Sequence, residues 1–115
     1  MFGRGEMRVK ASKKSVRAYA TFEDLERQFG PMTLGRFIKV FRQGDEASQT
    51  AYAKRLGISK ANLCDIEKER KLVGIDRAAK FARVLGLPEA ALVQLAMQDQ
   101  LNAAKIKLRV VVRAA

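Results

Sequence analysis

The chain has 115 residues, with 23 lysines and arginines against 12 aspartates and glutamates, no histidine and one cysteine. A chain of this length forms one domain, and without histidine or a second cysteine it lacks the common zinc sites, an internal disulfide and the usual general base. No apolar stretch is long enough for a signal peptide or a membrane span, so we expect a cytoplasmic protein that is not an enzyme, stays off the membrane and needs no cofactor or metal.

The positive charge is distributed unevenly. Residues 33–72 hold nine basic and five acidic residues, and residues 101–115 hold four basic and none acidic, whereas residues 73–100 are balanced. A polyanion is the natural partner of such a chain, although a merely soluble basic protein has the same balance.

The first 32 residues divide into two predicted parts. Residues 1–20 are basic, rich in small side chains and without a sustained period. We expect a flexible arm there, either solvated or lying in a groove of a bound duplex. Residues 21–32 predict a short preceding helix, because Thr21 is a suitable N-cap, apolar residues follow on one helical face and Gly30-Pro31 ends the pattern.

Residues 33–100 predict a domain of five helices. Thr33, Ser48 and Ser59 are N-cap residues, each followed by apolar side chains at helical spacing. Gly57 suits a turn that needs positive φ between the second and third helices. The fourth helix should end at Gly86, and the fifth should begin at Pro88 and reach about residue 99.

The two short helices around Gly57 have the spacing of a helix-turn-helix. If Leu63 and Ile66 point into the core, the outer side of the helix over residues 59–68 is small and polar at its N-terminal end. Such a helix suits a major groove about 12 Å wide. The sequence therefore predicts binding to double-stranded DNA.

The last segment, residues 101–115, changes period. Apolar residues alternate with mostly basic ones over residues 105–113, which predicts a half-buried strand that needs a partner edge. An extra apolar stripe on the fifth helix of the domain indicates a protein contact. In a two-fold dimer, the two helices over residues 59–68 would lie about 34 Å apart and could enter successive major grooves. The predicted dimer residues are Val93, Met97, Ile106, Leu108, Val110 and Val112. Pairing of the strand with the N-terminal segment or with a different protein stays open.

Over about residues 33–96 the chain resembles the Cro/XRE-type, or lambda-repressor-like, helix-turn-helix family. The matching elements are Arg42, the segment "SQTAYAKRLGIS", the pair Ile66-Glu67 and Ala82-x-x-Leu85-Gly86 within "KFARVLGLP". The resemblance implies an all-α fold of five helices, here with a short preceding helix and a C-terminal strand that pairs in a dimer.

The resemblance also implies roles for particular residues. It implies that Gln49 holds a phosphate, that Lys60, Ala61 and Asp65 contact bases, and that Arg42 and Glu67 form a structural ion pair. From the helical wheel and the position at helix starts we add residues beside them. The full predicted DNA-binding set is Gln49, Ser59, Lys60, Ala61, Asn62, Asp65, Lys68 and Arg70.

Three positions depart from the family pattern. Asp65 puts a negative charge against the duplex, so it either accepts from a cytosine amino group or repels wrong sequences. Ala61 offers only a methyl contact. Lys68-Glu69-Arg70 replaces the usual Asn-Gly pair, so the phosphate grip there must come from Lys68, Arg70 or Lys71.

These features support three hypotheses. The first is a dimeric repressor that reads the major groove with the helix over residues 59–68. The second is an antitoxin that represses its own operon and masks a toxin protein with one of its ends. The third is a module that bridges proteins and touches DNA weakly.

Overall fold

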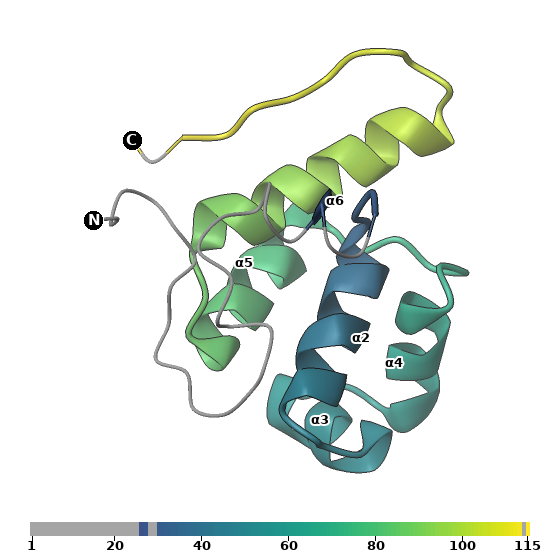
Figure 1. The fold of residues 1–115 in the computed structure, drawn as a ribbon, viewed down its shortest axis with the longest axis vertical. Helices are drawn as coiled ribbons and strands as arrows, with labels where there is room; N and C mark the ends of the chain where they lie inside the picture. The colour runs from purple at the N-terminus through teal and green to yellow at the C-terminus, as the bar shows by residue number, and fades with distance from the viewer. Residues whose placement is uncertain (1–25, 28–29, 114) are drawn as a thin grey trace.

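A computed structural model of the chain describes residues 26–27, 30–113 and 115 (Figure 1). The predicted arm over residues 1–20 lies outside this described part. Of the predicted helix over residues 21–32, residues 26–27 are helical and residues 30–32 lie outside any helix, while the others are not in the described part. Five further helices follow, and no strand is found among the described residues. The helices are α2 (Leu34–Gly44), α3 (Gln49–Leu56), α4 (Lys60–Glu67), α5 (Ile75–Leu85) and α6 (Glu89–Ala103).

The helix boundaries follow from the caps. The hydroxyl oxygens of Ser48 and Ser59 accept the backbone N–H groups of Ala51 and Asn62 at 3.0 Å, so both short helices begin with a satisfied amide. Gly57 ends α3 in the left-handed region with φ 77°, which a side chain would oppose. The turn between α3 and α4 is therefore fixed by local chemistry.

The core is built around α2. Phe37, Ile38 and Phe41 have no exposed surface, and the two phenylalanine rings meet edge to face with centroids 4.6 Å apart. Tyr52 from α3 and Phe81 from α5 are equally buried. One apolar face of each helix thus meets in a single core, as the helical periodicity predicts.

Helices α2 and α4 cross closely at Gly35. A Cβ atom placed on Gly35 would lie 2.0 Å from the carbonyl oxygen of Ile66, so no side chain fits there. The backbone of α4 is brought against α2 at this point, and the opposite side of α4 is turned outward. The sequence gives no sign that this glycine, inside a helix, has such a role.

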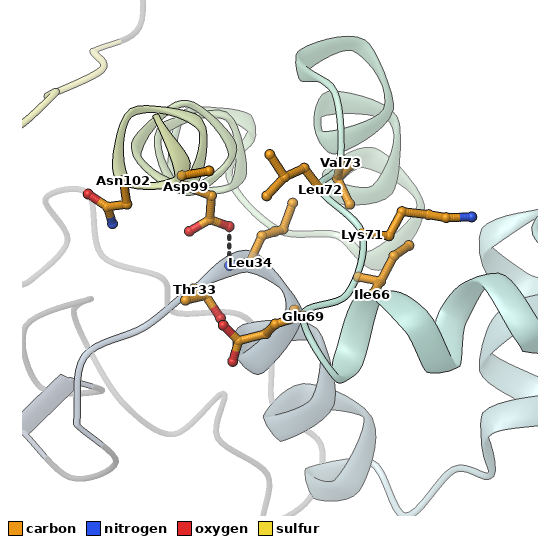
Figure 2. A pocket seen from close by; sticks show the side chains of 11 residues that line it. Thr33, Leu34, Ile66, Glu69, Lys71, Leu72, Val73, Asp99 and Asn102 are labelled. Atoms are coloured by element: carbon orange, nitrogen blue, oxygen red, sulfur yellow. Dashed lines mark hydrogen bonds between the residues drawn. The ribbon is translucent and has the colours of Figure 1, made fainter. Parts of the chain in front are cut away.

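Helix α6 is joined to the start of α2. The Asp99 carboxylate accepts a hydrogen bond from the backbone N–H of Leu34 at 3.0 Å (Figure 2). The Thr33 side chain caps the same helix through the N–H of Arg36. A cleft of about 270 Å³ opens beside this contact, between α6, the start of α2 and the loop after α4. Burial in this cleft, partly opposed by the hydrogen bond from Leu34 and assisted by the nearby charge of Glu69, raises the pKa of Asp99.

The predicted C-terminal strand is not found, and the last helix is longer than expected. Helix α6 continues to Ala103 rather than ending near residue 99. Lys105 then takes a left-handed conformation, φ 61°, and the N–H of Ile106 donates to the carbonyl oxygen of Leu101, which closes a helix-terminating turn. The chain reverses and runs back along α6 (Figure 1).

Glutamine side chains replace the partner strand. The N–H groups of Val110 and Val112 donate to the side-chain oxygens of Gln98 and Gln94 at 2.9 Å, and the Gln98 amide donates to the carbonyl oxygen of Leu108 at 2.9 Å. A glutamine amide carries one acceptor and donors, as a peptide group does, so it can satisfy the edge of an extended chain. Alternating hydrophobicity alone cannot distinguish this arrangement from a strand in a sheet.

Candidate nucleic-acid interface

Helix α4 has two different sides. Leu63, Ile66 and Glu67 are buried against the rest of the domain. Lys60 and Ala61 are exposed, and Asp65 is half-buried on the outer side. The outer side is therefore small and polar at its N-terminal end, and it is open to a ligand.

A buried ion pair fixes the inner side of α4. The Arg42 Nε and Nη2 atoms lie 2.7 Å and 3.0 Å from the two oxygens of Glu67, which is the fork-to-fork geometry of a strong pair. Arg42 Nη1 also donates to the carbonyl oxygen of Ala47 at 2.9 Å. The two side chains are 13% and 2% exposed, so the pair ties the end of α2 to α4 with little access for water.

Gln49 completes this cluster. Its side-chain Nε2 donates to Glu67 at 3.0 Å, so Glu67 accepts from two different residues. An amide nitrogen carries two N–H groups, and one contact with Glu67 leaves the other for a second acceptor. The buried carboxylate of Glu67 thus orients the side chain of Gln49, which lies in the first turn of α3.

The outer polar groups of α4 meet the loop that follows the helix. The Asp65 carboxylate accepts from Arg70 Nε and Nη2 at 3.1 Å and 2.9 Å, and the Asn62 side-chain oxygen accepts from Lys71 Nζ at 2.7 Å. The Asp65 charge is therefore compensated, and both cations are held beside the outer side of α4. These pairs span five and nine residues, so no helical spacing in the sequence predicts them.

A comparison with models of protein families matches a helix-turn-helix domain over residues 33–95. The chain belongs to this helix-turn-helix family, of the XRE/Cro type. The resemblance inferred from the sequence is thereby confirmed. No curated protein and no solved structure matches the chain.

Family membership decides the broad function of the helix-turn-helix. The domain is a DNA-binding one and the family is non-enzymatic. Helices α3 and α4, joined by the short turn at Gly57, lie inside the matched residues 33–95.

The loop after α4 starts under backbone strain. Glu69 has φ 61°, a left-handed conformation that costs a side chain about 1–2 kcal/mol. It stands where the family pattern has a glycine, which takes this conformation freely. Lys68 just before it is exposed, and its N–H donates back to the carbonyl oxygen of Cys64 at 3.0 Å. The segment Lys68-Glu69-Arg70, which replaces the Asn-Gly pair, therefore forms the turn after α4 with a strained backbone at Glu69.

The predicted dimer residues fall into two groups in the single chain. Ile106 and Leu108 are 44% and 64% exposed. The remaining four are half-buried, namely Val93, Met97, Val110 and Val112. The single chain thus covers part of the apolar surface that the sequence analysis assigned to a second copy.

The described part of the chain offers neither a candidate metal site nor a membrane-spanning helix. Residues 26–27, 30–113 and 115 contain no group of three or more His, Cys, Asp or Glu side chains that could hold a metal ion. None of the helices in those residues is long and apolar enough to cross a membrane.

Proposed function

We propose that this protein is a sequence-specific DNA-binding regulator that represses transcription by occupying a duplex site, with α4 in the major groove. The observation that carries the proposal is the contrast between the sides of α4. Its inner side is fixed by the buried Arg42–Glu67 pair, 13% and 2% exposed, while Lys60 and Ala61 on the outer side are open to solvent. A rigid helix with a small polar outer side suits a groove.

Direct readout is assigned to the start of α4. Lys60 and Asn62 can reach base edges from the first turn, and the Ala61 methyl group can contact thymine. Asn62 first has to exchange its hydrogen bond with Lys71 for one to a base. Both bonds involve exposed groups, so little free energy opposes the exchange.

Asp65 is assigned a positioning role. Its carboxylate holds Arg70 through two hydrogen bonds to one oxygen, so its negative charge is already compensated. Arg70 and the exposed Lys68 then supply the phosphate contacts that the Asn-Gly pair would give. Of the two roles left open by the sequence, base reader or repeller, neither fits as well as the support of Arg70.

Contacts with the DNA phosphates are assigned to residues at the N-termini of α3 and α4. Gln49 is oriented by Glu67 and retains an N–H for a phosphate oxygen. The Ser59 oxygen caps α4, and its own hydroxyl hydrogen is available as a donor. Both residues lie at the positive end of a helix, which favours an anion.

We further propose that two copies bind adjacent half-sites and act in the cytoplasm. Of the predicted dimer residues, Ile106 and Leu108 keep exposed side chains that can form such a contact. Equilibrium sedimentation with and without a duplex containing two half-sites measures the association. A single copy bound to that duplex would contradict the dimer but not the DNA-binding role.

The experiment that tests the proposed function is footprinting on the DNA upstream of the gene for this protein. We expect protection of two short stretches about 10 base pairs apart, centre to centre, on one face of the duplex. The matched variant is Lys60→Ala with Asn62→Ala, which should abolish discrimination between the protected site and random DNA. Uniform protection by both proteins would contradict sequence-specific readout by α4.

Salt dependence separates this function from a protein-bridging module. A DNA-binding protein loses affinity linearly in log salt, with a slope near −0.9 per neutralised phosphate on B-DNA. Absence of duplex binding even at low salt would favour the bridging module. A protein encoded beside this one that copurifies with it would instead support the antitoxin alternative.

A further inference from the structure

The extended C-terminal segment, here called the tail and defined as residues 108–113, has one satisfied and one open edge. Its inner edge is held by Gln94 and Gln98 of α6 through three hydrogen bonds. Backbone groups of an extended chain alternate in direction, so those of Arg109, Val111 and Arg113 point away from α6. Within the described residues, these three have no backbone hydrogen bond.

Such an edge is preorganised for another strand. Extended peptides bind to open edges by backbone hydrogen bonds, and alternate side chains give the specificity. Here the conformation is set before binding, because two glutamines four residues apart on one helix hold it. The ordering cost that a loose tail would incur on binding is therefore reduced.

The side chains along this edge indicate which residue types a partner strand should have. Arg109 and Arg113 flank Val111, which is 63% exposed, and the segment after α6 holds four basic residues and no acidic one. Directly opposite residues in neighbouring strands stabilise a sheet when their charges are opposite and destabilise it when they are alike. The complement is an apolar residue between two acidic ones at alternate positions.

A second copy of this chain does not meet that requirement. Antiparallel pairing that uses all three outward residues centres Val111 on its own counterpart. It then places each Arg109 directly opposite an Arg113, which is two like-charge pairs in one short ladder. Pairing of the tail with itself is therefore disfavoured by charge.

The duplex bound by α4 is also a poor match. The tail lies beyond α6, at the opposite end of the molecule from α3 and α4 (Figure 1). DNA offers no peptide groups to the open edge, and Leu108 and Val111 would remain uncovered at 64% and 63% exposure. The tail and the reading helix thus face different partners.

We propose that the tail binds an extended segment of a different protein, which adds a strand to the outward edge of residues 109–113 through an acidic, apolar, acidic pattern at alternate positions. The proposal does not depend on the DNA-binding role. It gives the domain a second interaction surface, away from the helix-turn-helix, through which another protein can bind while α4 remains accessible.

The test uses the full chain and a short capped peptide containing Glu-Thr-Val-Thr-Glu, with Lys-Thr-Val-Thr-Lys as the matched control. Binding is followed by the backbone amide signals of the protein in NMR titrations at low salt. We expect the glutamate peptide to shift the signals of Arg109, Val111 and Arg113 and to bind at least about tenfold more tightly than the lysine peptide. Equal binding of both peptides, or of neither, overturns the proposal.

Two variants separate the edge from general charge. Val111→Pro removes an outward N–H and should weaken the glutamate peptide about tenfold while the melting curve stays unchanged, because that N–H has no partner in the described chain. Arg109→Glu with Arg113→Glu should reverse the preference between the two peptides. An unchanged affinity in either variant contradicts the proposal.

Two further outcomes identify a different occupant. Sedimentation that shows a dimer for the parent protein and a monomer for Val111→Pro would assign the edge to a second copy. Competition between duplex DNA and the glutamate peptide for the signals of residues 109–113 would assign it to nucleic acid. Either result overturns the proposal and leaves the assignment of α4 to be judged by its own footprint.

Discussion

The two sides of α4 are held by ion pairs of opposite character. On the inner side, Arg42 and Glu67 are 13% and 2% exposed. On the outer side, Arg70 and Asp65 are 58% and 34% exposed, at a similar distance of 2.9 Å. Similar distances therefore have unequal consequences, because water screens the outer pair and is excluded from the inner one. The inner pair sets where the helix lies, and the outer pair can exchange its partner for a ligand.

The largest expected effect comes from bringing the inner side of α4 away from α2. Gly35→Ala places a Cβ atom 2.0 Å from the carbonyl oxygen of Ile66, a backbone atom that cannot move without shifting α4. We expect a loss of at least about 3 kcal/mol in unfolding free energy, at the upper end of overpacking costs. Denaturant unfolding measures it, with Gly74→Ala as the control, because a Cβ there meets nothing within 4 Å. Equal stabilities for the two variants would contradict the close crossing.

An effect of similar size concerns the inner ion pair. Arg42→Ala leaves the Glu67 carboxylate buried without its main partner, and breaking such a pair costs about 3–5 kcal/mol. The control is Arg83→Ala, which breaks an ion pair with Glu89. Its two charged groups lie 3.0 Å apart, and its side chains are 60% and 52% exposed. That variant should lose less than about 1 kcal/mol. Similar melting temperatures for both variants would show that burial does not distinguish the pairs.

A smaller effect on stability and a clear one on binding are expected on the outer side. Asp65→Asn releases Arg70, and the exposed pair contributes less than about 1 kcal/mol to stability. Without Asp65 to position it, Arg70 should lose its phosphate contact, so duplex affinity should fall and the salt slope should become shallower by about 0.9, the value for one phosphate. Asp76→Asn in the first turn of α5 is the matched charge control. Identical slopes for the two variants would exclude the positioning role of Asp65.

The smallest effect is a change in pH dependence at Asp99. Its pKa is raised, mainly by burial, so folding favours its protonated form. Its contribution to stability is greatest at low pH and falls as pH rises from the ordinary value of 3.8 through the raised pKa. Asp99→Asn keeps an oxygen for the N–H of Leu34 and removes the titration.

The measurement for Asp99 is the difference in unfolding free energy between the variant and the parent protein. This difference should move in favour of the variant as pH rises above 3.8 and become constant above the raised pKa. Glu69, Lys71 and the other groups around the cleft are the same in both proteins, so the difference reports on residue 99. A difference that does not change with pH would contradict the raised pKa.

Local chemistry made much of the fold predictable. Ser48, Ser59 and Gly57 mark the ends of α3 and α4 through hydrogen bonds and backbone conformations that involve neighbouring residues. The apolar spacing of α2 predicts its buried face because every member contacts the same core. Recognition of the family rested on these same elements, and the matched range of residues 33–95 agrees with it.

Contacts between distant residues were not predictable from the sequence. A glycine is needed at position 35 because the backbone of Ile66, 31 residues later in the chain, lies against it. The residues next to Gly35 in the sequence are those of an ordinary helix interior and do not indicate this contact. Apolar and basic residues alternate along the tail as they do in a strand. The backbone N–H groups of its inner edge nevertheless donate to Gln94 and Gln98, which in the sequence look like two residues of an ordinary exposed helix face. The pattern of a segment predicts its conformation, whereas its partner depends on what the fold brings alongside.

The most direct test of the central claim uses Cys64, the single cysteine of the chain, which is half-buried on α4 between the inner side and the outer residue Asp65. The measurement is the rate of alkylation of Cys64 with and without the footprinted duplex, with Cys64→Ser plus Val84→Cys on α5 as the control. If α4 lies in the major groove, the duplex should slow alkylation of Cys64 at least about tenfold and leave the Val84→Cys thiol unaffected. An unchanged rate at Cys64 under saturating duplex would contradict the assignment of α4 as the reading helix.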